Sequence, residues 1–428
     1  MSYRNALNVF ELQEIARRRL PSPLYGYIEG GVEDNQARDN NRSVFQRIRF
    51  RQRSPLDVSR RSQAVELFGR RFDSPFGIAP MGIAGVFAFD ADIRMARAAA
   101  RMNVPFTLSG YSTLPMEAVA KQASHARWLQ AYMDSDRERA TQLTRRAAAA
   151  GYEVLMVSTD VPVRPNRENN VRNGFTLPLR LSARLLLQGA VHPRWSVETF
   201  ARTVLKYGVP RLENLVVGGR PSLRKPAMKT DMWAGRGGVD WELMRFLRDQ
   251  WQLPLLVKGT LHPADAEMAV RVGLDGVVVS NHGGRQLDGA MSPIEAIPEI
   301  RAAVGNKLKI LADSGFRRGT DILKGLALGA DFILLGRAAM FAVAAGGEEG
   351  VVHALSLLKA EVDNDLGLLG CPSVDQLDPS FLHFSDLFPQ GVPSQQAESP
   401  RPVLSVAGNR LVVAGASHRI PFTEGELS

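Results

Sequence analysis

Eight short apolar segments, each followed by a helical segment, restrict the fold of this 428-residue chain more than any other feature. The sixth segment contains a run of three valines, Val277 to Val279, which is typical of a strand buried on both faces. The segments cover residues 76–79, 106–108, 127–132, 154–159, 255–258, 276–280, 309–312 and 332–335. Eight strands that alternate with helices predict an α/β fold, the TIM (β/α)8 barrel. A doubly wound sheet is the alternative, but the turn after the first strand, Pro80-Met81-Gly82-Ile83, lacks its glycine fingerprint.

The segments between the strands carry the apolar spacing of amphipathic helices. We predict helices over residues 91–102, 137–150, 241–250, 263–272, 293–304 and 320–328. An N-terminal helix over residues 8–19 precedes the barrel, with Asn8 as its N-cap, and a helix over residues 348–369 closes it. We therefore assign residues 1–385 to one barrel domain.

Two parts of the chain depart from the alternation. Residues 168–238 form an insertion after the fourth strand, and a connection of that length indicates a lid or a docking element. Within it, residues 182–190 and 197–207 have the spacing of amphipathic helices. Residues 386–428 are rich in Pro, Gly, Ser and Gln, so we expect a partly disordered tail with one edge strand near residues 410–414.

The formal net charge of +9 comes from basic residues spread along the chain. Such a surface is compatible with small anionic substrates or with anionic lipid. No basic-aromatic motif accompanies the charge, so we predict no nucleic-acid partner. Association of residues 180–235 with a membrane surface is the sharper hypothesis for the insertion. A helical insertion packed on the barrel, or a subunit contact, is the alternative.

The single cysteine, Cys371, excludes a disulfide within the chain and cannot by itself build a cysteine metal cluster. We therefore predict no metal site and a reducing compartment. Residues 1–20 lack the apolar segment of a signal peptide, and no apolar run approaches the roughly 20 residues of a spanning helix. We expect a cytoplasmic protein, and the insertion hypothesis would place it peripherally on the inner face of the cell membrane.

Polar residues end seven of the eight predicted strands, and in a barrel these ends meet at one mouth. They are Ser109, Gln130, Tyr132, Ser158, Asp160, Lys258, Ser280, His282, Asp313 and Arg337. A cap, a turn or a surface ion pair explains any one of them, but their convergence predicts an active site. His282 can accept a proton near neutral pH, and Arg285 in the same loop offers a planar fork that suits a carboxylate.

The turns after the last two strands have the composition of a phosphate site. Asp313-Ser-Gly-Phe-Arg-Arg-Gly319 follows the seventh strand, and Gly336-Arg337 follows the eighth. In barrels these turns bind phosphate through backbone amides and a helix N-terminus, and Arg317 and Arg337 would add positive charge. We therefore predict a ligand that carries a monophosphate.

Lys258 at the end of the fifth strand allows two kinds of chemistry. It can form a Schiff base with a carbonyl substrate. It can instead stay protonated and stabilise negative charge on a bound cofactor. Nearby, Asp160 and His282 can pair across the mouth, where the carboxylate would fix the tautomer of the imidazole.

The sequence resembles the FMN-dependent L-2-hydroxy acid oxidases and dehydrogenases from about residue 10 to residue 371. Its most specific motif is Ser280-Asn-His-Gly-Gly-Arg-Gln-Leu-Asp288, the active-site signature of that family. Further motifs are Leu20-Pro-Ser-Pro-Leu-Tyr25, Leu129-Gln-Ala-Tyr132, Leu256-Val-Lys-Gly259 and the 313–319 turn. The resemblance is closer to the L-lactate and (S)-mandelate dehydrogenases than to glycolate oxidase. It implies a barrel that binds FMN, oxidises a small L-2-hydroxy acid to the 2-oxo acid and assembles as a homotetramer.

The resemblance also implies a role for each site residue. His282 matches the base that takes a proton during oxidation, and Asp160 matches its carboxylate partner. Lys258 matches the lysine beside the flavin N1–C2 carbonyl, which disfavours the Schiff base. The matches to substrate-binding positions are Tyr25, Tyr132, Arg167 and Arg285. The matches to cofactor-binding positions are Pro80, Met81, Gly82, Ser109, Gln130, Ser158, Lys258, Ser280, Asp313, Gly315, Arg317, Gly336 and Arg337.

Gly82 stands where oxidases of this family commonly have Ala and its dehydrogenases have Gly. The resemblance therefore favours a dehydrogenase that passes electrons to a quinone or another carrier. The alternative is an oxidase that uses oxygen and produces hydrogen peroxide. Tyr111 stands where glycolate oxidase has Trp and where the mandelate enzyme has a smaller residue. The resemblance therefore allows both lactate-sized and aromatic substrates. A Schiff-base aldolase, a non-catalytic basic protein and an isoprenoid-isomerase-like FMN barrel are more distant alternatives.

Overall fold

The structure is a computed structural model, and it describes residues 2–122, 125–175, 183–215, 222, 233, 235–384, 404–406 and 411–413. The chain divides into two units, Met1–Ser385 and Asp386–Ser428. In the second unit, strand β14 (Leu411–Val413) pairs antiparallel with β13 (Leu404–Val406). The strand expected near residue 410 is thus present as part of a two-stranded sheet. The disorder expected for the rest of 386–428 concerns residues outside those that the structure describes.

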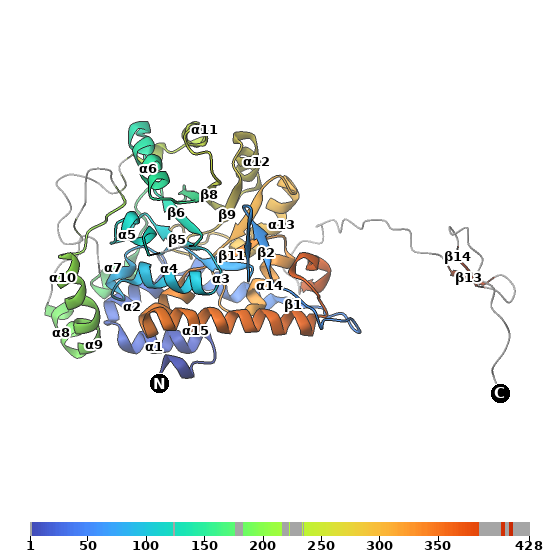
Figure 1. The fold of residues 1–428 in the computed structure, drawn as a ribbon, viewed down its shortest axis with the longest axis horizontal. Coiled ribbons are helices and arrows are strands. Elements are labelled where there is room, and N and C mark those ends of the chain that lie inside the picture. Colours follow the sequence, from blue (N-terminus) through green and yellow to red (C-terminus); the bar gives the residue numbers. More distant parts are fainter. Residues whose placement is uncertain are drawn as a thin grey trace. The chain divides into compact units, whose positions relative to one another are not determined.

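Eight parallel strands of the first unit close into a barrel (Figure 1). In their order around the barrel they are β10 (Lys309–Ala312), β11 (Phe332–Leu335), β4 (Phe76–Ile78), β5 (Phe106–Ser109), β6 (Arg127–Ala131), β7 (Val154–Ser158), β8 (Leu255–Thr260) and β9 (Gly276–Val279). β9 also pairs with β10, so the sheet has no free edge. The predicted barrel is confirmed with each strand in its predicted place, and the doubly wound sheet is excluded.

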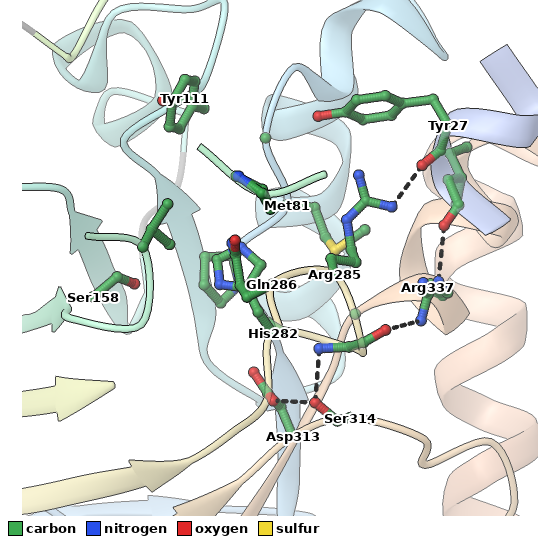
Figure 2. A pocket seen from close by; sticks show the side chains of 18 of the residues that line it. Tyr27, Met81, Tyr111, Ser158, His282, Arg285, Gln286, Asp313, Ser314 and Arg337 are labelled. Atoms are coloured by element: carbon green, nitrogen blue, oxygen red, sulfur yellow. Dashed lines mark hydrogen bonds between the residues drawn. The ribbon is translucent and has the colours of Figure 1, made fainter. Parts of the chain in front are cut away.

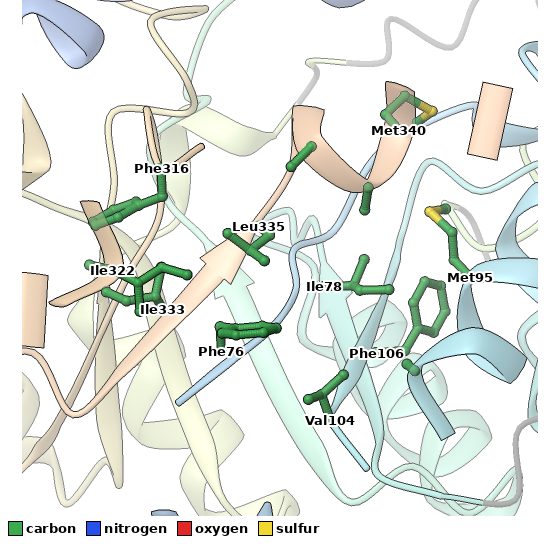
Figure 3. Packing of buried hydrophobic residues seen from close by; sticks show 14 of the residues in the cluster. Phe76, Ile78, Met95, Val104, Phe106, Phe316, Ile322, Ile333, Leu335 and Met340 are labelled. Atoms are coloured by element: carbon green, nitrogen blue, oxygen red, sulfur yellow. The ribbon is translucent and has the colours of Figure 1, made fainter. Parts of the chain in front are cut away.

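Helices follow the barrel strands at the places that the apolar spacing predicted. They are α4 (Ala91–Arg101), α6 (Arg137–Ala149), α11 (Trp241–Gln250), α12 (Pro263–Val272), α13 (Pro293–Val304) and α14 (Gly319–Ala327). A short helix that the sequence did not indicate, α5 (Met116–Ala120), follows β5. Between strands and helices lies a continuous apolar layer, in which Phe76, Ile78 and Ile333 pack near Met95 and Ile322 (Figure 3). This layer holds the helices on the barrel and leaves the strand ends to the site.

The interior of the barrel contains a second apolar cluster, which includes Trp128, Leu256 and Phe332. A hairpin of β2 (Val65–Leu67) and β3 (Arg70–Phe72) contributes Phe72 to this cluster. The Phe72 ring lies 5.8 Å from that of Phe332 and 6.3 Å from that of Trp128. Apolar side chains therefore fill the N-terminal end of the barrel, and the polar groups gather at the C-terminal ends of the strands.

An N-terminal segment precedes the barrel, as predicted. In α1 (Val9–Arg19) the side chain of Asn8 accepts a hydrogen bond from the backbone N–H of Glu11 at 3.0 Å, which is the predicted N-cap. Two helices follow that the sequence did not indicate, α2 (Ser22–Glu29) and α3 (Gln36–Ser43). Strand β1 (Ile48–Phe50) then pairs with β12 (Leu382–Phe384) from the other end of the unit.

The closing helix, α15 (Arg337–Leu369), begins earlier than predicted and is kinked at Gly347, where φ is 62°. By length and composition α15 is long and apolar enough to cross a membrane. However, 61% of its apolar 18-residue stretch is buried inside the protein. α15 contacts α1 and α4, and α1 runs beside it in Figure 1. We therefore assign α15 to the core of the barrel unit.

In the insertion, the structure describes α7 (Glu168–Asn173), α8 (Ala183–Val191), α9 (Pro193–Trp195), a π-helical turn (Ser196–Ala201) and α10 (Arg202–Tyr207). The helices expected over 182–190 and 197–207 are thus largely present. Trp195 Nε1 donates to the backbone oxygen of Val86 at 3.0 Å, and the Tyr207 hydroxyl donates to Asp90 at 2.8 Å. These helices are therefore docked on the barrel. Residues 176–182, 216–221, 223–232 and 234 of the insertion lie outside the described residues.

Candidate active site

His282 and Asp160 face each other at the mouth of the barrel, from the loops after β9 and β7. His282 Nδ1 lies 3.0 Å from Asp160 Oδ2, and the hydroxyl of Tyr132 lies 3.5 Å from His282 Nε2. The backbone N–H of His282 donates to Ser280 Oγ at 3.0 Å. The structure thus brings the predicted pair together, and it leaves Nε2 on the side of Tyr132 and of the cavity that both residues line.

Burial and neighbouring charges set the protonation of this pair. Burial lowers the pKa of His282 below its usual value, although the charge of Asp160 opposes the shift. Burial alone would raise the pKa of Asp160, but the charge and hydrogen bond of His282 and the charge of Lys258 hold it below its usual value. At neutral pH the imidazole is therefore neutral and the carboxylate ionised, which is the state of a base that is ready to accept a proton.

The loop that carries His282 has a left-handed backbone at three successive residues. The φ angles are 56° at His282, 70° at Gly283 and 71° at Gly284. A Cβ atom on Gly284 would overlap the backbone of Arg38, so this position requires glycine. A non-glycine residue in this region is strained, and the hydrogen bonds to Ser280 and Asp160 hold His282 there.

Lys258 on β8 is an ion-paired cation in the wall of the cavity. Its Nζ lies 2.9 Å from Asp313 Oδ2 and donates to Ser280 Oγ at 2.6 Å. Burial alone would lower the pKa of Lys258, but the charges of Asp313 and Asp160 raise it above its usual value. A Schiff base requires the neutral amine, so this setting favours the electrostatic role of Lys258.

Two guanidinium groups, of Arg285 and Arg167, reach the cavity beside His282. Arg285 Nη1 donates to the backbone oxygen of Tyr27 at 2.7 Å (Figure 2). It also donates to the backbone oxygen of Gly30 at 2.7 Å. Arg167 Nε donates to the backbone oxygen of Arg285 at 3.0 Å. Burial, with the charge of Arg167, lowers the pKa of Arg285 to about 9, so it remains a cation at neutral pH. Neither guanidinium is ion-paired to a carboxylate within the described residues, and together they suit a carboxylate ligand.

Helix α2 places Tyr27 rather than Tyr25 at the cavity. The Arg285 guanidinium lies 4.8 Å from the centre of the Tyr27 ring, and Tyr27 lines the cavity. The hydroxyl of Tyr25 instead accepts a hydrogen bond from Gln13 at 3.0 Å, and its ring stacks on Phe341 at 5.9 Å. Residues two apart on a helix point in nearly opposite directions. Tyr25, the predicted substrate contact, therefore lies outside the lining of the cavity, and Tyr27 takes its place there. The period of a helix over residues 22–29 would have indicated this difference.

The cavity at the mouth has a volume of about 460 Å³. Most predicted cofactor residues line it, namely Pro80, Met81, Gly82, Gln130, Ser158, Lys258, Asp313, Gly315, Arg317, Gly336 and Arg337. The other two lie directly behind this lining. Ser109 donates to Gln130 at 3.2 Å, and Ser280 accepts from Lys258 at 2.6 Å. The structure therefore gathers the predicted cofactor residues around a single space.

Ser314, which lines the cavity, and Asp288, which does not, connect the loops around it. Ser314 Oγ accepts from the backbone N–H of Gly283 at 2.9 Å and donates to Asp313 at 2.8 Å. Asp288 accepts from the backbone N–H groups of Asp34 and Ala37 at 3.0 and 2.8 Å. Ser314 thus ties two barrel loops together, and Asp288 ties the His282 loop to the N-terminal segment.

The turns after β10 and β11 have the features of an anion site. Gly315 has a φ of 93°, and a Cβ atom there would overlap the carbonyl of Asn41. α15 begins at Arg337, so the first backbone N–H groups of this helix lack intrahelical acceptors. Gly336 and Arg337 line the cavity, so this helix N-terminus lies at the mouth of the barrel. The Arg337 guanidinium itself donates to the backbone oxygens of Ile28 and Gly283, at 2.8 and 2.9 Å.

Several polar groups of the lining lack a partner among the described residues. Gln130 Nε2 and Ser158 Oγ are buried without a hydrogen bond. Arg317 is 7% exposed, and its guanidinium contacts the ring of Phe341 at 5.6 Å without a hydrogen bond to any described residue. Buried donors without acceptors and buried charges without partners reduce the free energy of unfolding. The lining therefore suits a ligand that is both polar and anionic.

The family model of FMN-dependent dehydrogenases matches residues 16–384. The chain belongs to the FMN-dependent dehydrogenase family. It is 42% identical to (S)-mandelate dehydrogenase of Pseudomonas putida over 380 residues, which cover 88% of this chain and 94% of that protein. It is 39% identical to L-lactate dehydrogenase of Caulobacter sp. (strain K31) over 381 residues, 88% of this chain and 98% of that one.

A solved structure shows the same likeness. The crystal structure of the monotopic membrane protein (S)-mandelate dehydrogenase matches with a TM-score of 0.82 and 41% identity, covering 89% of this chain and 100% of that one. This member of the FMN-dependent dehydrogenase family is therefore an oxidoreductase with FMN as cofactor, as predicted. The Schiff-base aldolase and the non-catalytic basic protein are excluded. The unpartnered groups of Gln130, Ser158 and Arg317 fit the polar ring, ribityl chain and phosphate of this cofactor.

We expect Arg317→Met to weaken FMN binding by roughly 10- to 100-fold, because a hydrogen bond to a charged group contributes about 1.5–3 kcal/mol. The dissociation constant follows from quenching of FMN fluorescence during reconstitution of the apoprotein. Arg318→Met is the matched control, since Arg318 pairs with Glu361 at 3.0 Å and does not line the cavity. Equal losses in both variants, or none in Arg317→Met, would contradict a phosphate contact of Arg317.

Proposed function

We propose that this enzyme oxidises an L-2-hydroxy acid to the 2-oxo acid and passes the electrons to a quinone or another carrier. One observation carries the proposal. A neutral His282, held by Asp160, lies beside the guanidinium groups of Arg167 and Arg285 in the cavity that suits FMN. Within the part of the chain that the structure describes, neither guanidinium has a carboxylate partner. The relatives named for mandelate and lactate support this class of substrate.

In this proposal Arg167 and Arg285 bind the substrate carboxylate, and Tyr132 contacts its hydroxyl. When bound, FMN would supply the acceptor for the two electrons and for the second hydrogen that the substrate loses. His282 Nε2 takes up one proton, and Asp160 stabilises the imidazolium that results. His282 ends the step protonated whether the hydrogen on Cα leaves as a proton or as a hydride. Lys258 adds a fixed positive charge where negative charge develops.

Gly82 supports a quinone or another carrier, rather than oxygen, as the electron acceptor. This residue lines the cavity, and a Cβ atom on it would lie 2.9 Å from Tyr111 Cβ, which is too close for an unmoved neighbour. The chain thus has the glycine of the dehydrogenases at a place where an alanine would require Tyr111 to shift. The same oxidation with oxygen as acceptor, forming hydrogen peroxide, is the second candidate.

Stopped-flow absorbance tests the function directly. We expect L-mandelate or L-lactate to reduce the bound flavin, while the D-enantiomers do so at least about tenfold more slowly, because the fixed carboxylate site and base select one hand. The reduced enzyme, mixed with a soluble quinone or with oxygen, should reoxidise faster with the quinone. An oxidase would show the opposite order, and a flavin that no 2-hydroxy acid reduces would remove the proposal.

We expect His282→Asn to keep the bound flavin but to lose roughly 10²–10⁴-fold in the rate of flavin reduction, since the general base is gone. In the unchanged enzyme this rate should fall as the pH drops through the pKa of His282, because the imidazolium cannot accept a proton. Burial lowers that pKa, so the loss should begin below the usual range of histidine. Near-normal reduction of the flavin in His282→Asn would remove His282 from this role.

Peripheral attachment to the inner face of the cell membrane is also part of the proposal. The solved mandelate dehydrogenase is a monotopic membrane protein, and helices α8 to α10 of this chain expose apolar side chains. They include Leu187, Val191, Val197 and Leu205. The homotetramer implied by the resemblance likewise remains a prediction, which light scattering of the purified protein measures.

Sedimentation with anionic vesicles tests the attachment. We expect the intact chain to pellet with vesicles, and Leu205→Asp to shift it toward the supernatant, because Leu205 is 86% exposed on α10. Leu253→Asp is the control, since Leu253 is exposed on a loop before β8, away from the insertion. If neither substitution changes the fraction of protein that pellets with vesicles, the insertion is not the segment that attaches the protein to the membrane.

A further inference from the structure

Arg236 is a buried cation beside the cavity that the proposed mechanism does not use. It lies in a short 3-10 turn (Arg236–Gly238) at the end of the insertion, and only 7% of it is exposed. Its Nη2 donates to the hydroxyl of Tyr111 at 2.9 Å. Its guanidinium carbon lies 4.5 Å from the centre of the Tyr132 ring and 5.3 Å from that of Tyr111.

The two rings that Arg236 contacts form one wall of the cavity. Tyr111 and Tyr132 both line it, with their ring centres 4.7 Å apart in an edge-to-face arrangement. Tyr132 is also the residue whose hydroxyl lies 3.5 Å from His282 Nε2. Arg236 itself is not part of the lining, so it acts on the cavity through these two side chains.

The backbone around Arg236 is built for this contact. Gly235 has a φ of 77°, and a Cβ atom there would lie 2.9 Å from Asp134 Cβ. Gly235 also accepts a hydrogen bond from the backbone N–H of Ser135 at 3.2 Å. The loop with Asp134 and Ser135 directly follows Tyr132 in the chain. Glycine at 235 thus lets the end of the insertion approach closely enough for Arg236 to lie over the Tyr132 ring.

No carboxylate compensates the charge of Arg236 within the described residues, and its Nη1 has no hydrogen-bond partner there. A buried guanidinium normally requires an anionic partner. Here two aromatic faces and one phenol oxygen take that place, which is a cation–π arrangement. Such an arrangement orients the rings more than a simple apolar contact would, because a cation is attracted to the face of a ring and repelled by its edge.

We propose that Arg236 is a positioning residue that fixes Tyr111 and Tyr132 as a rigid aromatic wall and thereby favours 2-hydroxy acids with an aromatic side chain over those with a methyl group. The proposal rests on the oxidation of 2-hydroxy acids proposed above and names the substrate class for it. A flat substituent gains contact with a wall that is held in place, whereas a methyl group touches little of it. The carboxylate site of Arg167 and Arg285 is common to both kinds of substrate.

The experiment compares the holoenzyme with Arg236→Gln, Tyr111→Phe and the double variant. For each, kcat/KM is measured with L-mandelate and with L-lactate, and their ratio is the discrimination. We expect Arg236→Gln to lower the discrimination about tenfold, mainly through a higher KM for mandelate. In the Tyr111→Phe background the same change should lower it less than about threefold, because the hydrogen bond is already absent.

A second measurement does not depend on turnover. The dissociation constants of phenylglyoxylate and pyruvate for the oxidised holoenzyme follow from changes in flavin absorbance. Their ratio should fall in Arg236→Gln as the discrimination does. If no 2-hydroxy acid reduces the flavin, the proposed function fails while this ratio still tests Arg236.

Arg137→Gln is the matched control, because Arg137 lies 5.3 Å over the ring of Phe246 on the outer helices α6 and α11. It removes an arginine–aromatic contact away from the cavity and should leave both ratios unchanged. If Arg236→Gln does not fold with bound flavin, Arg236→Lys and Tyr111→Phe alone supply the same comparison. Ratios that stay within twofold of the unchanged enzyme, or strictly additive effects of positions 236 and 111, would overturn the proposal.

Discussion

The candidate active site depends on the carboxyl end of helix α2. Its last carbonyl groups have no intrahelical partners and form the negative end of the helix dipole. Arg285 donates to the backbone oxygens of Tyr27 and Gly30, and Arg337 donates to those of Ile28 and Gly30. Two guanidinium groups from two barrel loops therefore meet at one helix end. This contact closes the mouth with a segment that is not part of the barrel, and it brings Tyr27 to the cavity.

The same contact explains how so many cations coexist. Six cationic side chains line the described cavity, and Asp313 is the only acidic one. Asp313 forms an ion pair with Lys258, and Asp160, which lies behind the lining, is paired with His282. Backbone carbonyl groups partly compensate the arginines that remain, but peptide dipoles do not neutralise a full charge. The site thus keeps an excess of positive charge, which an anionic cofactor and a carboxylate substrate can neutralise.

The barrel and the gathering of most proposed site residues around one cavity were predictable because both follow local rules. Parallel strands buried on both faces are continuous apolar runs, and a signature motif marks the loop of His282. Tyr27 was missed because Pro21, Pro23 and Gly26 conceal the helical period of α2, although proline is well tolerated in a first helical turn. Arg236 was missed for another reason. It sits in a glycine-rich turn after a long insertion, and its proximity to Tyr132 arises from tertiary packing that no local pattern encodes.

The insertion connects two regions of the enzyme that have different tasks. It begins next to Arg167, whose side chain holds the loop of Arg285, and it ends at Arg236, whose side chain holds Tyr111 and Tyr132. Its middle helices expose apolar side chains, including Leu205. Each end of the insertion therefore lies beside an arginine that contacts the loops or side chains lining the cavity. The middle helices expose the apolar side chains on which the proposed surface attachment rests.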